Sequence, residues 1–142
     1  MSGDELEGLA ERHLAAMNRH DAAAVAGLYS ERGIWAEPPG AQDLLGPRAV
    51  TQYLLLLFRA FPDLTISPLR TLTCRDTCVV EWRAEGTHRG AFLGVRGTGW
   101  HVEVHGASIL DVHDGQVLAS HHYCDSGTVL RQLDQLPRGE PL

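Results

Sequence analysis

The sequence predicts an α+β fold in which helices pack on one face of a curved antiparallel sheet. The helical patterns lie before residue 62, and four long strand-like segments follow one another after residue 63. Helices first and consecutive strands afterwards is an order typical of the α+β class. The length of 142 residues and the 44% hydrophobic composition suit one domain with one core, residues 1–142.

Three segments in the first half of the chain predict helices. They cover residues 4–20, 22–30 and 48–61. Asp21 can cap the second helix, because its side-chain oxygen accepts the free N–H groups of a first turn. Pro47 stands where the third helix should begin, and Pro62 ends it. Between these helices, residues 32–40 predict a short strand.

The second half predicts strands, because its segments are rich in β-branched and apolar residues. They cover residues 64–74, 77–88, 99–113 and 116–125. The Asp-Gly pair at 114–115 predicts a tight hairpin between the last two. A short helix over 126–133 closes the fold, and residues 136–142 are expected to form a frayed tail.

Period-two alternation assigns faces to these strands. The predicted inner sets are Trp100, Val102, Val104, Gly106, Ser108, Leu110 and Val112 on one strand, and Val80, Trp82, Ala84, Gly86 and His88 on its neighbour. In the last strand the choice stays open: Leu118, Ser120, His122 and Cys124 alternate with Val117, Ala119, His121, Tyr123 and Asp125. Small inner residues such as Ala84 and Gly106 leave space, which predicts a cavity.

Composition excludes several classes of function. The formal charge of −6 and the pI of about 5.7 give no basic surface for nucleic acid. Lysine is absent, so Schiff-base chemistry on a lysine is excluded. Three cysteines without a C-x-x-C pair argue against a disulfide framework or structural zinc, and favour a reducing, cytoplasmic setting. The acidic N-terminus does not read as a signal peptide, and the longest apolar run, 53–58, is too short to span a bilayer.

Two stretches, "WRAEGTHRGAFLGVRGTGWHVEVHG" and "DGQVLASHHYCDSGTVLRQL", resemble the SnoaL-like polyketide cyclases of the nuclear-transport-factor-2-like superfamily, which includes ketosteroid isomerase. The segments "AAMNRHDAAAVAGLYS" and "AFPDL" match too. The resemblance implies a cone-shaped barrel, with a strongly curved sheet wrapped around the helices and a pocket at its open end. It also implies intramolecular aldol ring closure without metal or organic cofactor, using a pocket carboxylate as base, and a homodimer formed through the outer face of the sheet.

The segment "HHYCD" holds the candidate catalytic residues. By the resemblance, His122 stands where many relatives carry an aspartate, and Asp125 matches a second acidic position. An imidazole near its usual pKa of about 6.5 can act as base and acid; the alternative for His122 is a hydrogen-bonded core histidine. Asp125 could orient that imidazole or act as the acid itself, or it could be the N-cap of the last helix.

Other residues are candidates for the cavity wall. The aromatic ones are Trp35, Tyr53, Phe58 and Trp82, which could equally be core. Ser108 and Tyr53 are candidate donors to an oxyanion. His88 could orient a loop or lie at the pocket rim, and His105 is expected on the outer face. Neighbouring His121 and His122 point to opposite faces, so no metal site is expected. Motifs for nucleotide cofactors are also missing from the sequence.

The preferred function is therefore cofactor-independent cyclisation or isomerisation of a bulky, largely apolar, polyketide-like metabolite by proton transfer. Two alternatives remain. One is a cofactor-free oxygenase or hydratase that tailors a similar molecule. The other is a non-catalytic ligand carrier or accessory protein, for which an ionisable residue inside the cavity would not be needed. A membrane partner is not expected.

Overall fold

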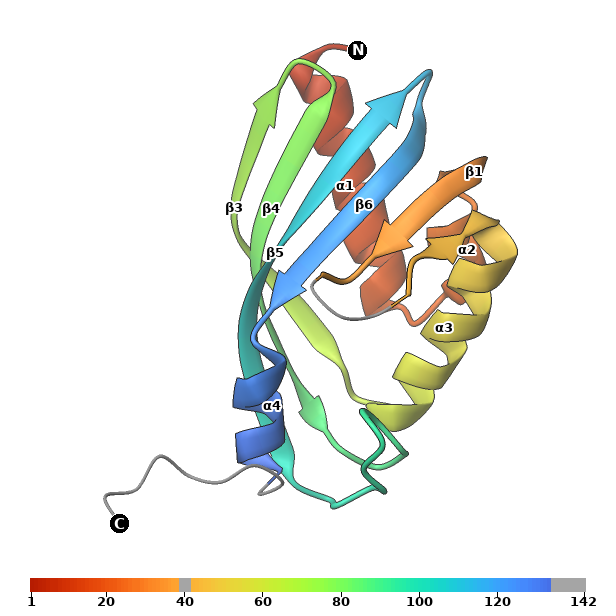
Figure 1. Cartoon of the computed structure of the whole chain (residues 1–142). Helices are drawn as coiled ribbons and strands as arrows, with labels where there is room; N and C mark the ends of the chain where they lie inside the picture. The colour runs from red at the N-terminus through yellow and green to blue at the C-terminus, as the bar shows by residue number, and fades with distance from the viewer. Residues whose placement is uncertain (39–41, 134–142) are drawn as a thin grey trace.

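The computed structural model describes residues 1–38 and 42–133, and it confirms the α+β class. A curved, unclosed six-stranded sheet carries three helices on one side and a fourth helix beyond the end of β6 (Figure 1). The tail predicted at 136–142 lies outside the described residues. None of the described helices has the length and apolar character needed to cross a membrane.

The helices begin where the capping signals place them. Their bounds are α1 Gly3–Asn18, α2 Ala22–Ala26, α3 Gly46–Ala60 and α4 Ser126–Gln132. The Asp21 side chain accepts a hydrogen bond from the backbone N–H of Ala24 at 3.0 Å, which satisfies a free donor of the first turn of α2. Helix α3 starts with Pro47 in its first turn. Helix α2 is shorter than predicted, because Tyr29 already belongs to the first strand.

The six strands form one sheet in the order β2-β1-β6-β5-β4-β3. Their bounds are β1 Tyr29–Ala36, β2 Leu44–Leu45, β3 Thr65–Cys74, β4 Thr77–Thr87, β5 His101–His113 and β6 Gln116–Cys124. The four long strands pair antiparallel, as the sequence predicts. The short β2 and the parallel pairing of β1 with β6 are not predicted. That parallel pairing places Trp35 opposite Ser120 in the middle of the sheet.

The β5–β6 hairpin decides which residues of β6 face inward. Asp114 and Gly115 both have positive φ, 49° and 75°, as a tight Asp-Gly turn requires. After the turn, Val112 pairs with Val117 but Asp111 pairs with Ala119, so Leu118 is the extra residue of a β-bulge. The bulge reverses the alternation: Val117 is fully buried, Leu118 is exposed, and Ser120 is fully buried. Leu118 and Ser120 therefore lie on different faces of the strand. One of the two sets considered from the sequence had placed them on the same face.

The larger of two buried apolar clusters joins α1, α2 and α3 to the sheet, and a smaller one joins the end of α3 to β5 and α4. Helix α1 packs against β3 and β4, and α3 packs against β1. Fully buried members of the core include Leu6, Leu9, Val50, Leu54 and Leu110. Trp100 is an exception to the predicted inner set of β5, because it precedes the strand and is 51% exposed. All three cysteines are free.

Candidate active site

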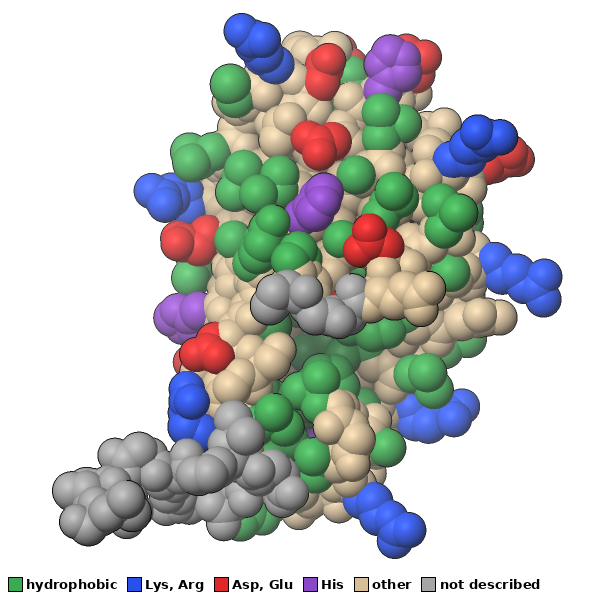
Figure 2. All heavy atoms as spheres, in the orientation of Figure 1, with side chains coloured by type: hydrophobic (Ala, Val, Ile, Leu, Met, Phe, Trp, Pro, Cys, Tyr) green, Lys and Arg blue, Asp and Glu red, His purple; other side chains and the backbone are tan. Residues whose placement is uncertain are grey.

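A cavity of about 600 Å³ opens between the helices and the concave face of the sheet. Side chains from α1, α3, α4, β1, β3, β4, β5 and β6 and from the adjoining loops line it, and most of them are apolar. On the face drawn in Figure 2, hydrophobic side chains gather around a hollow. The volume falls in the range of pockets that enclose a drug-sized organic ligand.

Trp82 owes its place in the cavity to Gly106. The two residues are partners across β4 and β5. A Cβ atom at Gly106 would lie 2.4 Å from Cη2 of Trp82 and 2.5 Å from the carbonyl oxygen of Tyr123. The missing side chain thus lets the indole lie across the neighbouring strand, where it forms part of the cavity wall.

Trp82, Ser108 and His122 meet in the cavity through hydrogen bonds. The indole N–H of Trp82 donates to Ser108 Oγ at 2.9 Å, and Ser108 Oγ lies 2.7 Å from Nδ1 of His122. On its other side, Nε2 of His122 lies 2.9 Å from Ser120 Oγ. Trp35 packs against the imidazole, with ring centroids 3.9 Å apart. Strand alternation predicts the inner positions of Trp82 and Ser108, whereas His122 belongs to one of the two sets that alternation leaves open for the last strand.

Burial controls the charge of His122. Removal from water lowers its pKa well below 6.5, and the nearby His13 and His121 lower it further. Burial likewise lowers the pKa of His13, another cavity residue, to about 4. Both imidazoles are therefore neutral at pH 7.

Glu37 brings a carboxylate into the cavity, and the sequence reading missed it. Its Oε1 accepts hydrogen bonds from the Trp35 indole N–H at 3.0 Å and from the Tyr53 hydroxyl at 2.6 Å. Oε2 has no hydrogen-bond partner among the described residues. One signal could have found Glu37. It lies two residues after Trp35, and at strand spacing such residues share a face.

Glu37 also sets the protonation of its neighbours. Burial and then the negative charge of Glu37 raise the pKa of Tyr53, so this hydroxyl keeps its proton and donates it to the carboxylate. Burial and then Glu37 raise the pKa of the Cys124 thiol, which shares the cavity. Cys124 is therefore not an activated nucleophile, because reactivity requires the thiolate.

Asp125 lies outside the cavity lining and caps α4. Its carboxylate accepts hydrogen bonds from the backbone N–H of Thr128 at 3.1 Å and from the Thr128 hydroxyl at 2.7 Å. These bonds lower the pKa of Asp125, as does the weaker attraction of Arg131. The side chain is exposed. The geometry therefore favours the capping alternative over the catalytic one.

Three other residues that the sequence assigned to ligand contact also lie outside the cavity lining. Tyr53 is engaged by Glu37, so its hydroxyl is not free to donate to a ligand. Phe58 is a core residue whose ring stacks on His20 at 4.6 Å. His88 is fully buried and its Nδ1 accepts a hydrogen bond from the backbone N–H of Thr98 at 3.2 Å, so it orients the loop before β5. Trp35, Trp82 and Ser108 do line the cavity.

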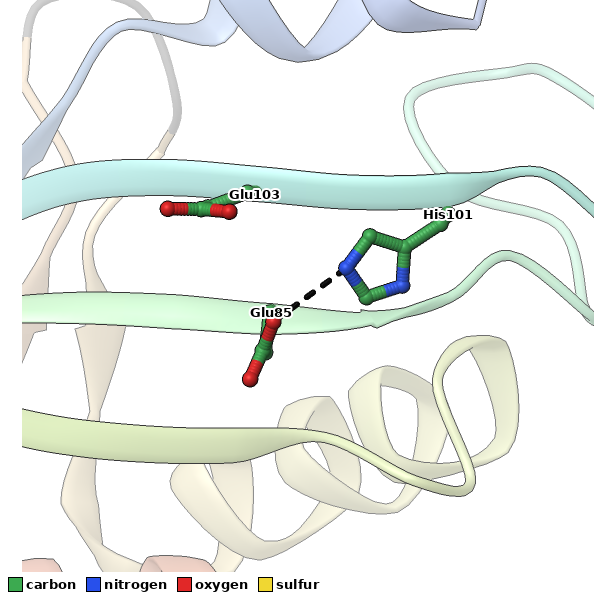
Figure 3. Close-up of side chains that lie close together, drawn as sticks. All are labelled: Glu85, His101 and Glu103. Atoms are coloured by element: carbon green, nitrogen blue, oxygen red, sulfur yellow. Dashed lines mark hydrogen bonds and ion pairs between the residues drawn. The ribbon is translucent and has the colours of Figure 1, made fainter.

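The outer face of the sheet carries a polar cluster at the beginning of β5 (Figure 3). Glu85, His101 and Glu103 could each offer one metal-ligand atom within 4.8 Å of the others. Arg83 already pairs with both carboxylates, at 3.5 Å for Glu85 and 3.2 Å for Glu103. A bound cation would have to displace this guanidinium, so the cluster is an exposed ion-pair network.

The same outer face carries an apolar row, which leads to a prediction about assembly. The strand registers align Leu72, Val79 and Ile109 across β3, β4 and β5. We expect an isologous homodimer through this face, because burial of the row removes apolar surface from water. Light scattering should give about twice the chain mass of 15.5 kDa. Ile109→Arg should give the monomer mass, whereas Leu55→Arg, on the exposed side of α3, should not. A wild-type monomer at micromolar concentration would contradict the prediction.

The comparison with family models assigns the chain to one family. The model of the SnoaL-like polyketide cyclases matches residues 7–133. Among curated proteins, no sequence matches the chain.

Several solved structures share the fold. AclR from Streptomyces galilaeus, a proposed hydroxylase, is 24% identical with a TM-score of 0.84, over 96% of this chain and 89% of AclR. IdmH from Streptomyces antibioticus, a proposed polyketide cyclase, is 22% identical with a TM-score of 0.75, over 91% of this chain and 98% of IdmH. A protein of ketosteroid isomerase-like fold from Catenulispora acidiphila, solved with trimethylamine, is 16% identical with a TM-score of 0.77, over 91% of this chain and 93% of that one.

Proposed function

Since this chain belongs to the SnoaL-like polyketide cyclase family, we propose that it catalyses cofactor-independent cyclisation or isomerisation of a bulky, polyketide-like metabolite by proton transfer. One observation carries the proposal: a carboxylate and a neutral imidazole share a mostly apolar cavity of about 600 Å³. A carrier of apolar ligands would have no use for a carboxylate there, since taking a charge out of water is costly even when hydrogen bonds offset part of that cost.

Glu37 is the base in this proposal. Trp35 and Tyr53 fix its Oε1, which leaves Oε2 to accept a proton from an acidified carbon of the ligand. The base was expected to be His122 or Asp125. Asp125 lies outside the cavity lining, and both ring nitrogens of His122 are hydrogen-bonded to serines. His122 therefore acts on the ligand through Ser108.

Ser108 is the donor to the developing oxyanion. Its oxygen accepts from the Trp82 indole N–H and contacts His122, so the hydroxyl is held in place before the ligand arrives. Preorganised donors of this kind stabilise a transition state strongly, because they need no reorientation when the charge develops.

The charge of the lining residues indicates a ligand without negative charge. Every cationic side chain of this protein is an arginine, and none lines the cavity among the described residues. Both cavity histidines are neutral at pH 7. A carboxylate on the ligand would thus meet Glu37 and no cation, so an ester or a ketone is the better fit.

Deuterium exchange tests the proposed function without knowledge of the natural substrate. The probe is methyl 3-(2-naphthyl)-3-oxopropanoate, a neutral aromatic β-keto ester with an acidic C–H at carbon 2. We expect the protein in D₂O to accelerate exchange at that carbon, measured by proton NMR, above the rate in buffer alone. The free acid of the probe should bind more weakly. Binding of the ester without any acceleration would contradict the proposal and favour a carrier.

A hydroxylation of the same ligand class is a second candidate, because the structurally similar AclR is a proposed hydroxylase. Mass spectrometry of the incubated probe separates the two reactions. Incorporation of one oxygen atom would support hydroxylation, whereas exchange or isomerisation leaves the oxygen count unchanged.

His122→Ala should slow the catalysed exchange roughly 10²-fold, because Ser108 loses the partner that orients it. The rate of the wild-type protein should not fall as the pH drops through about 6.5, since the lowered pKa keeps His122 neutral well below that pH. Asp125→Asn is the matched control: it alters the exposed cap of α4 and should leave the rate unchanged. Loss of rate in Asp125→Asn together with full activity in His122→Ala would reverse these roles.

A further inference from the structure

Five polar side chains form a continuous hydrogen-bonded chain, and three of them line the cavity. Ser108 contacts His122 at 2.7 Å, and His122 contacts Ser120 at 2.9 Å. Tyr29 donates its hydroxyl proton to Ser120 at 2.8 Å, and Nε2 of His13 lies 2.9 Å from the Tyr29 oxygen. Tyr29 is 2% exposed and Ser120 is fully buried, so bulk water does not interrupt the middle of the chain.

The direction of one bond fixes the protons of the others. Because Tyr29 donates to Ser120, its oxygen must accept from His13, which therefore carries its proton on Nε2. Ser120 has its own proton to donate, and Nε2 of His122 at 2.9 Å is a far better acceptor than the Ile34 carbonyl at 3.5 Å. His122 then carries its proton on Nδ1 and donates it to Ser108.

The chain consequently ends in one free acceptor and one free donor. At one end, Nδ1 of His13 has no hydrogen-bond partner among the described residues. At the other end, Ser108 accepts from both Trp82 and His122, which leaves its own hydroxyl proton to donate. His13 and Ser108 both line the cavity. Burial lowers the pKa of His13 to about 4, so its Nδ1 is unprotonated at pH 7.

We propose that this chain is a proton relay, with His13 as the accepting catalytic residue and Ser108 as the donating one. The relay rests on the proton transfer proposed above, in which Glu37 takes a proton from a ligand carbon. Ser108 gives its proton to the ligand oxyanion and takes one from Nδ1 of His122. Ser120 then gives its proton to Nε2 of His122, Tyr29 gives its proton to Ser120, and Nε2 of His13 gives its proton to Tyr29.

His13 takes up the proton that balances the one delivered by Ser108. Glu37 and His13 line the same cavity, and a water molecule there passes the proton that Glu37 removed from the ligand to Nδ1 of His13. Glu37 thus returns to a carboxylate and no net charge is left. When the product leaves, water in the cavity gives a proton to Ser108 and takes one from His13, which restores the original direction. The relay thus lets removal of a proton from carbon and delivery to oxygen occur at different places on one ligand.

The histidine tautomers test the directions of these hydrogen bonds independently of catalysis. Long-range ¹H–¹⁵N correlation spectra of the ¹⁵N-histidine-labelled protein at pH 7 should show neutral His13 with its proton on Nε2 and neutral His122 with its proton on Nδ1. A proton on Nε2 of His122 would overturn the relay. Ser120 would then accept hydrogen bonds from both Tyr29 and His122, and it could not pass a proton to His122.

Tyr29→Phe tests the relay in catalysis. The ring stays in place, but the hydroxyl that joins His13 to Ser120 is lost. Using the β-keto ester, we expect the catalysed rate to fall roughly 10-fold or more while the dissociation constant of the probe is unchanged, since Tyr29 is not a lining residue. Tyr123→Phe, on the exposed outer face, should change neither value. A wild-type rate in Tyr29→Phe would overturn the relay.

The wild-type protein provides a measurement that needs no variant to fold. A plot of its rate against the deuterium fraction of the solvent should be curved, because several protons move. A straight line would mean that one proton moves and would overturn the relay. If the wild-type protein does not accelerate exchange of the β-keto ester, the proposed function fails. The tautomer spectra still decide the directions of the hydrogen bonds in the chain.

Discussion

Glu37→Gln is expected to slow the catalysed removal of a carbon-bound proton roughly 10³-fold, the largest effect on rate of any single change in the cavity. Glutamine has the same shape, and its amide oxygen can still accept from Trp35 and Tyr53. The fold and the affinity for a neutral ligand should therefore persist. The amide cannot take up a proton at neutral pH, so only the chemical step should be lost.

The measurement is the deuterium exchange of the β-keto ester at saturating protein, with binding followed separately by tryptophan fluorescence. Glu31→Gln is the matched control, because Glu31 lies on β1, which ends at the residue before Glu37, but is exposed. It should keep the full rate. If Glu37→Gln keeps the full rate as well, the carboxylate is not the base, and the neutral His13 becomes the remaining candidate for that role.

Acidification from pH 7 to pH 4 is expected to remove about 3 kcal/mol of stability through His13 alone. Burial lowers the pKa of His13 from 6.5 in the unfolded chain to about 4 in the folded one. Below pH 6.5 the unfolded state therefore binds more protons than the folded state, so the free energy of unfolding falls as the pH falls. The loss ends near pH 4, where the folded state also becomes protonated. Above about pH 6.5 the contribution is complete and constant.

His122 adds to this loss in the same direction, because its pKa is also lowered. The two carboxylates with lowered pKa values, Asp63 and Asp125, lose most of their contribution below pH 4, because their usual pKa in the unfolded chain is 3.8. Urea unfolding at pH 7, 6, 5 and 4 measures the slope. His13→Gln should reduce it, whereas His113→Gln, at an exposed histidine, should not. A free energy of unfolding that stays constant from pH 7 to 4 would contradict the burial of a neutral His13.

Local patterns in the sequence determined much of the fold. Period-two alternation identified Trp82 and Ser108 as inner residues of neighbouring strands, and both line the cavity. Capping chemistry placed the starts of α2 and α3, since Asp21 and Pro47 act on the turns next to them. These signals succeed because each depends only on residues a few positions away.

Pairing between distant segments decided the rest of the site. The parallel pairing of β1 with β6 sets Trp35 opposite Ser120 and carries Glu37 to the cavity. The bulge at Leu118 depends on the register against β5 and selects Ser120 and His122 for the inner face. His13 reaches Tyr29 only because α1 packs beneath the sheet. The spacing of apolar residues shows which face of an element is buried, and capping residues show where a helix begins. Neither shows which other element covers that face, because the pairing depends on burial across the whole chain.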